Sequence, residues 1–212
     1  MIELFAAATP NGIKIAVALE WLDLPYKVTA ISLRGDAPRP PMFTAASPLG
    51  KIPAIHDTDT GVEMSESGAI LLYLAEKAGS SLLPPSGPER VAVLQWHFIA
   101  SATIGPAFGQ AHHYLHFQKG KAPYAEERSV AEVQRYYSVL EDRLSETDYL
   151  AGTAPSIADI ALWPWIIRFS WQGVDLNNYP GVARWYRTMS AMPACVAGYR
   201  KLQDSPDIPM PA

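Results

Sequence analysis

Residues 51–74 read KIPAIHDTDTGVEMSESGAILLYL, and this stretch decides the fold. Ile52–Asp57 is a short apolar run that predicts a strand, and Val62–Met64 predicts a second one. The polar turn Thr58–Gly61 between them favours a tight hairpin, so we expect the two strands to pair antiparallel. From Ser65 to Gly79 the apolar residues recur three or four apart, which predicts a helix that ends at the glycine.

The residues before this stretch predict a strand, a helix and another strand, over 2–6, 13–24 and 26–33. Thr9-Pro10-Asn11-Gly12 separates the first strand from the helix. The proline-rich stretch 34–48 is expected to be irregular, with one helical turn near 42–45. A strand-helix-strand unit has a right-handed parallel crossover. Together with the antiparallel hairpin, it predicts a small mixed α/β sheet with helices on its faces.

The chain changes character at Ser80–Pro88, SSLLPPSGP, which is typical of a domain linker. Beyond it the apolar periodicity is helical to the end. The expected helices cover 89–118 with a bend at Gly105-Pro106, 124–144, 156–169, 179–191 and 193–202. We therefore predict an α/β domain over 1–79, a linker over 80–88, an all-helical domain over 89–203 and a flexible tail over 204–212.

The composition limits function and location. The 212 residues are 49% hydrophobic with a net charge of −4, which argues against a nucleic-acid partner because such proteins need a basic surface. Cys195 is the single cysteine, so no intramolecular disulfide can form, which favours a reducing compartment. The N-terminus lacks the basic region of a signal peptide, and no apolar run has the length of a membrane span. We expect a cytoplasmic protein with no membrane partner.

Three short segments carry possible binding chemistry. Thr9–Gly12 opens a helix, where it is either a simple cap or a site for a thiolate or carboxylate. Lys51-Ile52-Pro53 places a proline at the start of a strand. This is either a trans proline at a sheet edge, or a cis bond that leaves the backbone of Ile52 free for a peptide-like ligand. Glu66-Ser67 is either an ordinary acidic first turn or a site for an amino acid head group.

These three segments, in this order and spacing, resemble the glutathione transferases, as does the capping-box sequence Ser156-Ile157-Ala158-Asp159. The resemblance covers roughly residues 1–203 of this chain. It implies a thioredoxin-like N-terminal domain, an all-α C-terminal domain and glutathione as co-substrate. It also implies that Lys51, Ile52 and Pro53 bind the cysteinyl backbone of glutathione, and that Glu66 and Ser67 bind its γ-glutamyl end.

A narrower resemblance is to the bacterial Nu-class glutathione transferases. The segments that carry it are TPNG at 9–12, ESGAILLYLAEK at 66–77, GQAHH at 109–113 and SIADIALWPW at 156–165. It implies glutathione-dependent disulfide reduction, binding of two thiols or of glutathione disulfide, and a homodimer. The resemblance makes Thr9 and Asn11 the catalytic residues, bonded to the glutathione sulfur. Arg128 would bind the ligand carboxylates, across the dimer interface.

The chain departs from the Nu-class pattern at two positions. Pro38 lies where the class usually carries a glutamine that binds glutathione, with Arg39 as the possible substitute, and Leu49 lies where the class often has asparagine. Proline offers neither a side-chain donor nor an N–H. We therefore expect an altered affinity for glutathione.

The second substrate stays open. The candidate pocket residues in the helical domain are Pro106, Phe108, His112 and Tyr114. A small-molecule disulfide, an aromatic electrophile or an aromatic ether are the alternatives, and a non-catalytic ligand-binding module is a further one. The three histidines at 112, 113 and 116 lack a cysteine or clear carboxylate to complete a tetrahedral set, so we expect no metal. Cys195 is expected to be a buried hydrophobe and not a nucleophile.

Overall fold

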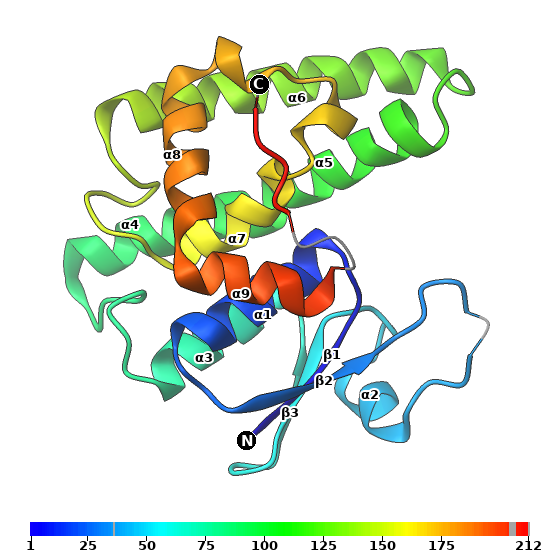
Figure 1. Ribbon diagram of the computed structural model, residues 1–212, viewed down its shortest axis with the longest axis vertical. Coiled ribbons are helices and arrows are strands. Elements are labelled where there is room, and N and C mark those ends of the chain that lie inside the picture. The colour runs from blue at the N-terminus through cyan, green and yellow to red at the C-terminus, as the bar shows by residue number, and fades with distance from the viewer. Residues whose placement is uncertain (36, 204–206, 212) are drawn as a thin grey trace. The chain divides into compact units, whose positions relative to one another are not determined.

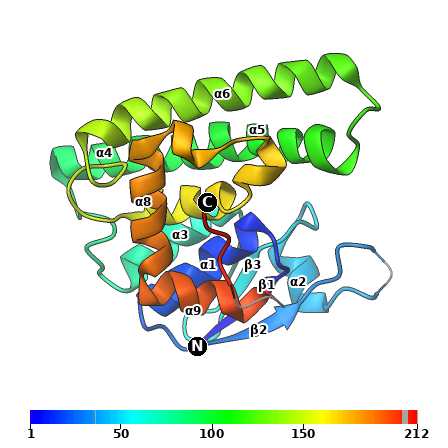
Figure 2. The ribbon, with the colours of Figure 1, turned by 45° about the horizontal axis from the view of Figure 1, so that its top comes forward.

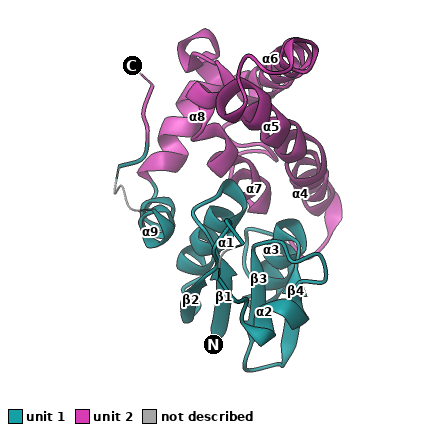
Figure 3. Cartoon of the chain, turned by 90° about the vertical axis from the view of Figure 1, so that its right-hand side faces the viewer, with its two compact units in different colours: residues 1–83, 192–208 teal, residues 84–191, 209–212 magenta. Residues whose placement is uncertain are grey.

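The computed structural model describes residues 1–35, 37–203 and 207–211. The chain forms two compact units, which Figure 3 draws in teal and magenta. The first contains Met1–Leu83 and Met192–Ile208, and the second contains Pro84–Ala191 and Pro209–Ala212. The break between residues 83 and 84 falls within the expected linker, although helix α4 (Gly87–Phe98) already begins inside it.

The first unit contains a four-stranded mixed sheet in the order β2-β1-β3-β4. Its strands are β1 (Ile2–Ala6), β2 (Tyr26–Ala30), β3 (Ala54–Asp57) and β4 (Val62–Ser65). β1 runs parallel to β2 and antiparallel to β3, and β3 pairs antiparallel with β4. This confirms the predicted crossover, hairpin and mixed sheet.

Helices cover both faces of this sheet. α1 (Pro10–Trp21) and α3 (Ser67–Lys77) lie on one side of the strands, and α2 (Pro41–Ala46) lies on the other (Figure 1). Phe43 of α2 packs against Phe5 of β1, with ring centroids 6.0 Å apart. Because side chains alternate along a strand, the neighbouring Leu4 faces away from Phe5. Both are buried, as expected for a sheet covered on both faces.

Helix α9 (Pro193–Leu202) also packs in the first unit, against α1. The sequence places this segment in the predicted all-helical domain, so the structure differs there. Gly198 explains the close packing, since a Cβ at this position would lie 2.5 Å from the backbone nitrogen of Val17. Of the expected tail, residues 204–206 and 212 lie outside the described residues, as does Asp36 of the irregular stretch before α2.

The second unit is helical. α4 continues into a π-helical segment (Ile99–Ile104), then α5 (Gly105–Ala111) and a second π-helical segment (His112–Phe117). α6 (Pro123–Glu146) packs beside α5 (Figure 2). The other elements are α7 (Ile157–Ile166), α8 (Pro180–Ala191) and short 3-10 turns at Phe169–Gln172 and Leu176–Asn178. The predicted bend at Gly105-Pro106 is the point where α5 begins, between the two π-helical segments.

The stretch Gly87–Phe117 is long and apolar enough to cross a membrane by length and composition. This differs from the expectation that no apolar run has the length of a membrane span. Core helices of soluble proteins pass the same test. Here Ile104, Phe108 and Ala111 of this stretch are buried within the helical unit, while 33% of its apolar window as a whole is buried.

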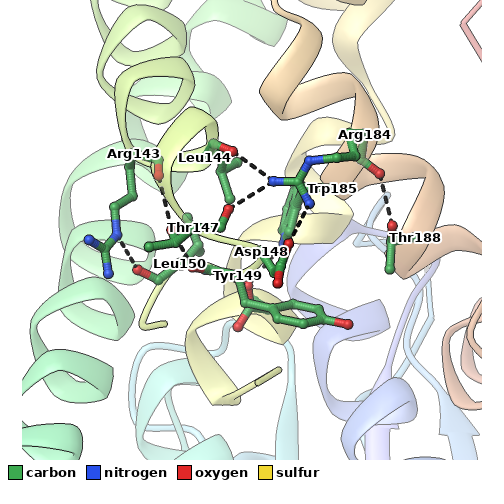
Figure 4. Close-up of polar contacts among 10 residues, drawn as sticks. Arg143, Leu144, Thr147, Asp148, Tyr149, Leu150, Arg184, Trp185 and Thr188 are labelled. Carbon is green, nitrogen blue, oxygen red and sulfur yellow. Dashed lines mark hydrogen bonds and ion pairs between the residues drawn. The ribbon is translucent and has the colours of Figure 1, made fainter. Parts of the chain in front are cut away.

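The loop between α6 and α7 is held by arginine side chains (Figure 4). Arg184 Nη2 of α8 donates to the carbonyl oxygens of Leu144 and Thr147, at 2.7 and 2.8 Å. Arg143 Nε donates to the carbonyl oxygen of Leu150 at 2.8 Å. The carbonyl groups at a helix C-terminus need such partners, because they have none inside the helix.

The predicted capping box at the start of α7 is confirmed. Ser156 Oγ accepts from the backbone N–H of Ala158 at 3.2 Å, and Asp159 Oδ2 accepts from the backbone N–H of Ser156 at 2.9 Å. The other carboxylate oxygen of Asp159 accepts from Leu150 N and Trp185 Nε1. The buried carboxylate thus joins the loop, α7 and α8.

Candidate functional site

The turn after β1 forms the start of helix α1. Thr9 is the N-cap residue, with extended φ and ψ of −121° and 160°, and its hydroxyl oxygen accepts from the backbone N–H of Gly12 at 3.2 Å. Pro10 occupies the first turn, where a missing N–H has no cost. The structure therefore confirms the helix-cap interpretation. Because the cap uses only the oxygen of the Thr9 hydroxyl as acceptor, the hydroxyl proton is left to donate to a ligand.

The loop before β3 contains a cis bond between Ile52 and Pro53, the second of the two alternatives for this proline. Ser47 supports this loop from a buried position. Its hydroxyl donates to the carbonyl oxygen of Lys51 at 2.7 Å and accepts from the N–H of Lys51 at 2.9 Å. The pairing of β3 with β4 begins at Ala54, so Ile52 precedes the ladder. Its backbone groups lie where an extended ligand could add to the sheet.

A cavity of about 240 Å³ opens beside this loop, lined in part by Arg39, Lys51 and Ile52. Arg39 Nη1 donates to the carbonyl oxygen of Gly50, and the Arg39 guanidinium lies 5.4 Å from the ring centroid of Phe43. The loop that carries Pro38 thus brings an arginine to the cavity. Two cations beside a free backbone segment suit a ligand carboxylate.

The turn between β4 and α3 carries the next pair of predicted site residues. Glu66 has a positive φ of 73°, a conformation that costs free energy for a residue other than glycine. Ser67 is the first residue of α3 and is 8% exposed. The N–H groups of a first helical turn, with the partial positive charge there, can bind a carboxylate.

Ser67 also contacts α1 through its side chain. Its hydroxyl lies 3.4 Å from Asn11 Oδ1 and 3.4 Å from Lys14 Nζ. The structure therefore brings the Asn11 turn and the Glu66-Ser67 turn together within one unit.

Lys14 is a residue of this site that is not among the predicted ones. It is 1% exposed, and burial lowers its pKa to about 7, while the negative charge of Glu66 acts in the opposite direction. The sequence feature that could have indicated Lys14 is its position as a lone lysine in the apolar run Ile13–Leu19, IKIAVAL. All residues of this run are buried. In an amphipathic helix a lysine is expected on the solvent-exposed face. Lys14 is buried because α3 and α9 both cover this helix.

The predicted pocket residues of the helical unit have different environments. Phe108 is fully buried and stacks on Tyr137, with ring centroids 5.5 Å apart. Pro106 is exposed, and His112 is buried. Phe108 and His112 are thus core residues of this unit and not exposed pocket residues. Their position on a helix does not show which way their side chains face.

His112 belongs to a buried polar network. Tyr137 donates to Gln172 Oε1 at 2.6 Å, and Gln172 Nε2 lies 2.9 Å from the carbonyl oxygen of Trp165 and 3.1 Å from His112 Nε2. Burial, followed by the positive charges of Arg168 and His116, lowers the pKa of His112 to about 4. The ring is therefore neutral at pH 7 and accepts from the Gln172 amide.

Arg128 and Tyr114 line a second cavity, of about 290 Å³, together with Gln110, Tyr124, Ala125, Ser129 and Glu132. Arg128 is exposed, and its Nη2 lies 4.0 Å from Glu132 Oε1 on the next turn of α6. This cavity combines aromatic walls with one cation and one carboxylate. Within the described ranges 1–35, 37–203 and 207–211, no three His, Cys, Asp or Glu side chains are grouped to hold a metal ion.

Family models match both halves of the chain. The glutathione S-transferase N-terminal domain matches residues 4–85, and the glutathione S-transferase C-terminal domain matches residues 123–188. The disulfide-bond oxidoreductase YfcG of Escherichia coli is 44% identical over 208 residues, covering 96% of this chain and 96% of that protein.

Solved structures extend the similarity to the whole fold. A glutathione transferase homologue from Lodderomyces elongisporus, with two glutathione molecules per subunit, has a TM-score of 0.88 at 34% identity. The match covers 95% of this chain and 99% of that one. A glutathione transferase from Pseudomonas putida, with one glutathione disulfide per subunit, has a TM-score of 0.85 at 32% identity and covers 94% and 90%.

Proposed function

Because this chain belongs to the glutathione S-transferase family, we propose that it catalyses glutathione-dependent thiol transfer, with the reduction of disulfides as its main reaction. One observation carries this proposal: Thr9 and Asn11 are the polar side chains at the start of α1, and the turn contains neither cysteine nor tyrosine. The reacting sulfur must therefore come from glutathione.

The reaction consists of two thiol-disulfide exchanges. The thiolate of one glutathione attacks a sulfur of the substrate disulfide, the S–S bond breaks, and the leaving thiolate takes up a proton. A second glutathione thiolate attacks the resulting mixed disulfide and releases the second substrate thiol. The two electrons come from two glutathione molecules, which leave as glutathione disulfide. The protein supplies binding and electrostatic stabilisation.

Glutathione binds along the first unit. The backbone of Ile52, in the loop of Lys51 and Pro53, pairs with the cysteinyl residue. The carboxylate of Glu66 holds the γ-glutamyl ammonium, and the backbone N–H at Ser67 holds the neighbouring carboxylate. Support comes from the position of Ile52 ahead of the β3 ladder and of Ser67 at the first turn of α3. Arg128 binds ligand carboxylates across the dimer interface, a role supported by its resemblance to an arginine of the Nu class and by its place at the wall of the 290 Å³ cavity.

The thiolate lies at the N-terminus of α1, where the helix dipole favours negative charge. Thr9 and Asn11 each donate one hydrogen bond, worth about 1 kcal/mol as a neutral bond and up to roughly 3 kcal/mol to a thiolate. This stabilisation raises the thiolate fraction near neutral pH, and the thiolate is the nucleophile. It suits disulfide exchange, in which the leaving group is itself a good thiolate.

A second candidate reaction is attack on an aromatic electrophile or ether. It is favoured by the 290 Å³ cavity of the helical unit, whose walls include Tyr114 and Tyr124. Substitution at an aromatic carbon needs more stabilisation than two neutral donors provide, so we rank it second. Non-catalytic ligand binding is the third outcome that the test below distinguishes.

The test compares turnover of glutathione with 2-hydroxyethyl disulfide and with 1-chloro-2,4-dinitrobenzene. We expect the disulfide to react faster. Asn11→Ala should lower the disulfide rate by about one to two powers of ten, since roughly 1.4 kcal/mol corresponds to a factor of ten. Cys195→Ser should leave it unchanged, because Cys195 is fully buried and glutathione provides the sulfur. Asn178→Ala, an exposed position, is the matched control.

Faster reaction of the chloroaromatic would favour the second candidate, and binding without turnover would favour the third. Loss of activity in Cys195→Ser with full activity in Asn11→Ala would contradict the mechanism.

We also propose a cytoplasmic homodimer. The helical unit exposes large apolar side chains: Val91, Phe98, Phe117, Tyr124, Val130 and Val139. Apolar residues left in water favour association. Light scattering at micromolar concentration should give twice the mass of one chain, and a monomeric mass would contradict the dimer.

A further inference from the structure

The side chains of Lys14, Ser67 and Asn11 form a chain of polar contacts between the two turns of the first unit. Lys14 Nζ lies 3.4 Å from Ser67 Oγ, and Ser67 Oγ lies 3.4 Å from Asn11 Oδ1. Lys14 is 1% exposed and Ser67 is 8% exposed, so bulk water does not compete strongly for these groups. The three residues come from α1 and from the first residue of α3.

The protonated lysine determines which group donates and which accepts in this series of hydrogen bonds. A lysine ammonium has three donors and no acceptor, so Ser67 Oγ must accept from it. The hydroxyl proton of Ser67 is then directed away from Lys14 and donates to Asn11 Oδ1. Since the amide oxygen of Asn11 faces Ser67, its Nδ2 is the atom that remains to donate on the opposite side.

We propose that Lys14 is a positioning residue, which orients the Ser67 hydroxyl and, through it, turns the Asn11 amide nitrogen toward the glutathione sulfur. This inference rests on the proposed function, because it assigns the sulfur to Asn11. A neutral lysine can accept a hydrogen bond, so its deprotonation allows the Ser67 proton to turn back to Lys14. Asn11 then loses its fixed orientation. The site thereby senses pH through a group that does not touch the reacting atoms.

The titration of Lys14 falls in the relevant range, since burial lowers its pKa to about 7. The elements that make the main contacts with α1 in this unit are β1, α3 and α9. Their charged residues are Glu3 on β1, Glu76 and Lys77 on α3 with Glu66 before it, and Arg200 and Lys201 on α9. Among these charges, that of Glu66 acts on Lys14 and favours the ammonium form.

A double-mutant cycle tests the coupling. We expect Lys14→Met to lower kcat/KM for 2-hydroxyethyl disulfide about five- to tenfold at pH 6.5, the loss typical of one hydrogen bond. In an Asn11→Ala background the same substitution should cost less than twofold, because residues that act through one another are not additive. Lys27→Met, at an exposed lysine of β2, is the control and should have no effect in either background.

A pH series separates positioning from general structural damage. S-methylglutathione has no thiol to titrate, and its amino group stays largely protonated up to about pH 7.5, so its affinity between about pH 5.5 and 7.5 reports on the protein. Wild-type affinity should fall about two- to fivefold with rising pH, because Asn11 loses the fixed orientation in which it donates to the thioether sulfur. Lys14→Gln, which keeps a donor but cannot titrate, should retain most activity and bind with a flat profile. It also replaces Lys14→Met if that variant fails to fold.

Three results would overturn the inference: a flat wild-type profile, an unchanged profile in Lys14→Gln, or equal losses for Lys14→Met in both backgrounds. None of these affects the proposed function, which fails separately if the wild-type protein neither binds S-methylglutathione nor reduces the disulfide.

Discussion

The hydroxyl of Ser47 bonds to both backbone polar groups of Lys51, donating to the carbonyl oxygen at 2.7 Å and accepting from the N–H at 2.9 Å. One side chain thus fixes the loop that leads to Ile52. The hydroxyl replaces a strand partner that this part of the chain lacks, since the β3 ladder begins at Ala54.

Replacing this hydroxyl should affect both stability and binding. We expect Ser47→Ala to lower the free energy of unfolding by about 1–2 kcal/mol, because buried polar groups lose their partner. Glutathione affinity should fall as well, since the loop is less well ordered. Urea denaturation and calorimetric titration measure the two effects. Ser138→Ala, at an exposed serine of α6, is the control and should change stability by less than about 0.5 kcal/mol. Unchanged values for Ser47→Ala would contradict this role.

Arg39 is expected to bind a ligand carboxylate at the 240 Å³ cavity. Arg39→Ala should weaken glutathione binding about three- to fivefold, a small effect because the guanidinium is exposed. The difference from wild type should shrink at high salt, which screens exposed charges. Arg34→Ala, an exposed arginine of the same loop, should bind like wild type. Equal losses in both variants would indicate a general charge effect and not a site at Arg39.

Glu66 is expected to hold the γ-glutamyl ammonium. Glu66→Gln keeps the size of the side chain and removes the charge, so glutathione binding should weaken about five- to twentyfold. Calorimetry with Glu63→Gln as control isolates the position, because Glu63 is an exposed glutamate on the adjacent strand β4. Wild-type affinity in Glu66→Gln would remove this residue from the site.

The buried His112 predicts an acid-sensitive stability. Its folded pKa of about 4 lies below the usual value of 6.5, so between these values the unfolded chain binds a proton that the folded chain does not. Stability must therefore fall as the pH is lowered through this range. We expect a loss of about 2 kcal/mol from this group between pH 7 and 5. Urea denaturation at both pH values should show a smaller loss in His112→Gln.

The exposed neighbour His113 is the control for this measurement. His113→Gln should lose as much stability as wild type on acidification. An equally large loss in His112→Gln would show that another group causes the acid sensitivity.

The architecture of the first unit follows from local signals. The apolar runs at 2–6 and 54–57, the polar turn at 58–61 and the helical periodicity after Ser67 lie close together in sequence, and each has a direct physical reading. The same holds for the capping box at Ser156 and Asp159, whose partners are three residues apart. Contacts between neighbours in sequence are those that a pattern can predict.

Contacts between distant residues were not predictable in this way. Helix α9 was expected from its periodicity, but not its packing against α1, which depends on the close approach of Gly198 to Val17. The π-helical segments at 99–104 and 112–117 have no period that distinguishes them from an α-helix. The buried state of His112 likewise depends on Tyr137 and Gln172, which lie on other elements.

The residues of the candidate site likewise fall into those predictable from local sequence and those that depend on distant contacts. Thr9, Ile52-Pro53 and Glu66-Ser67 stood out because each combines turn residues with a helix or strand start. Ser47 and Lys14 did not, because a serine in a loop and a lysine in a helix are ordinary. Their importance comes from Lys51 in one case and from Ser67, 53 residues away, in the other.

The place of α9 in the first unit sets an order for folding on the ribosome. The strands and α1 are synthesised first, but the helix that packs against α1 emerges only after the helical unit. An N-terminal domain that is contiguous in sequence can fold as soon as it leaves the exit tunnel. Here the apolar surface of α1 stays uncovered until the whole of the helical unit, more than a hundred residues, has been synthesised. A nascent chain stalled after α8 would expose that surface, because the first unit is completed only when α9 emerges.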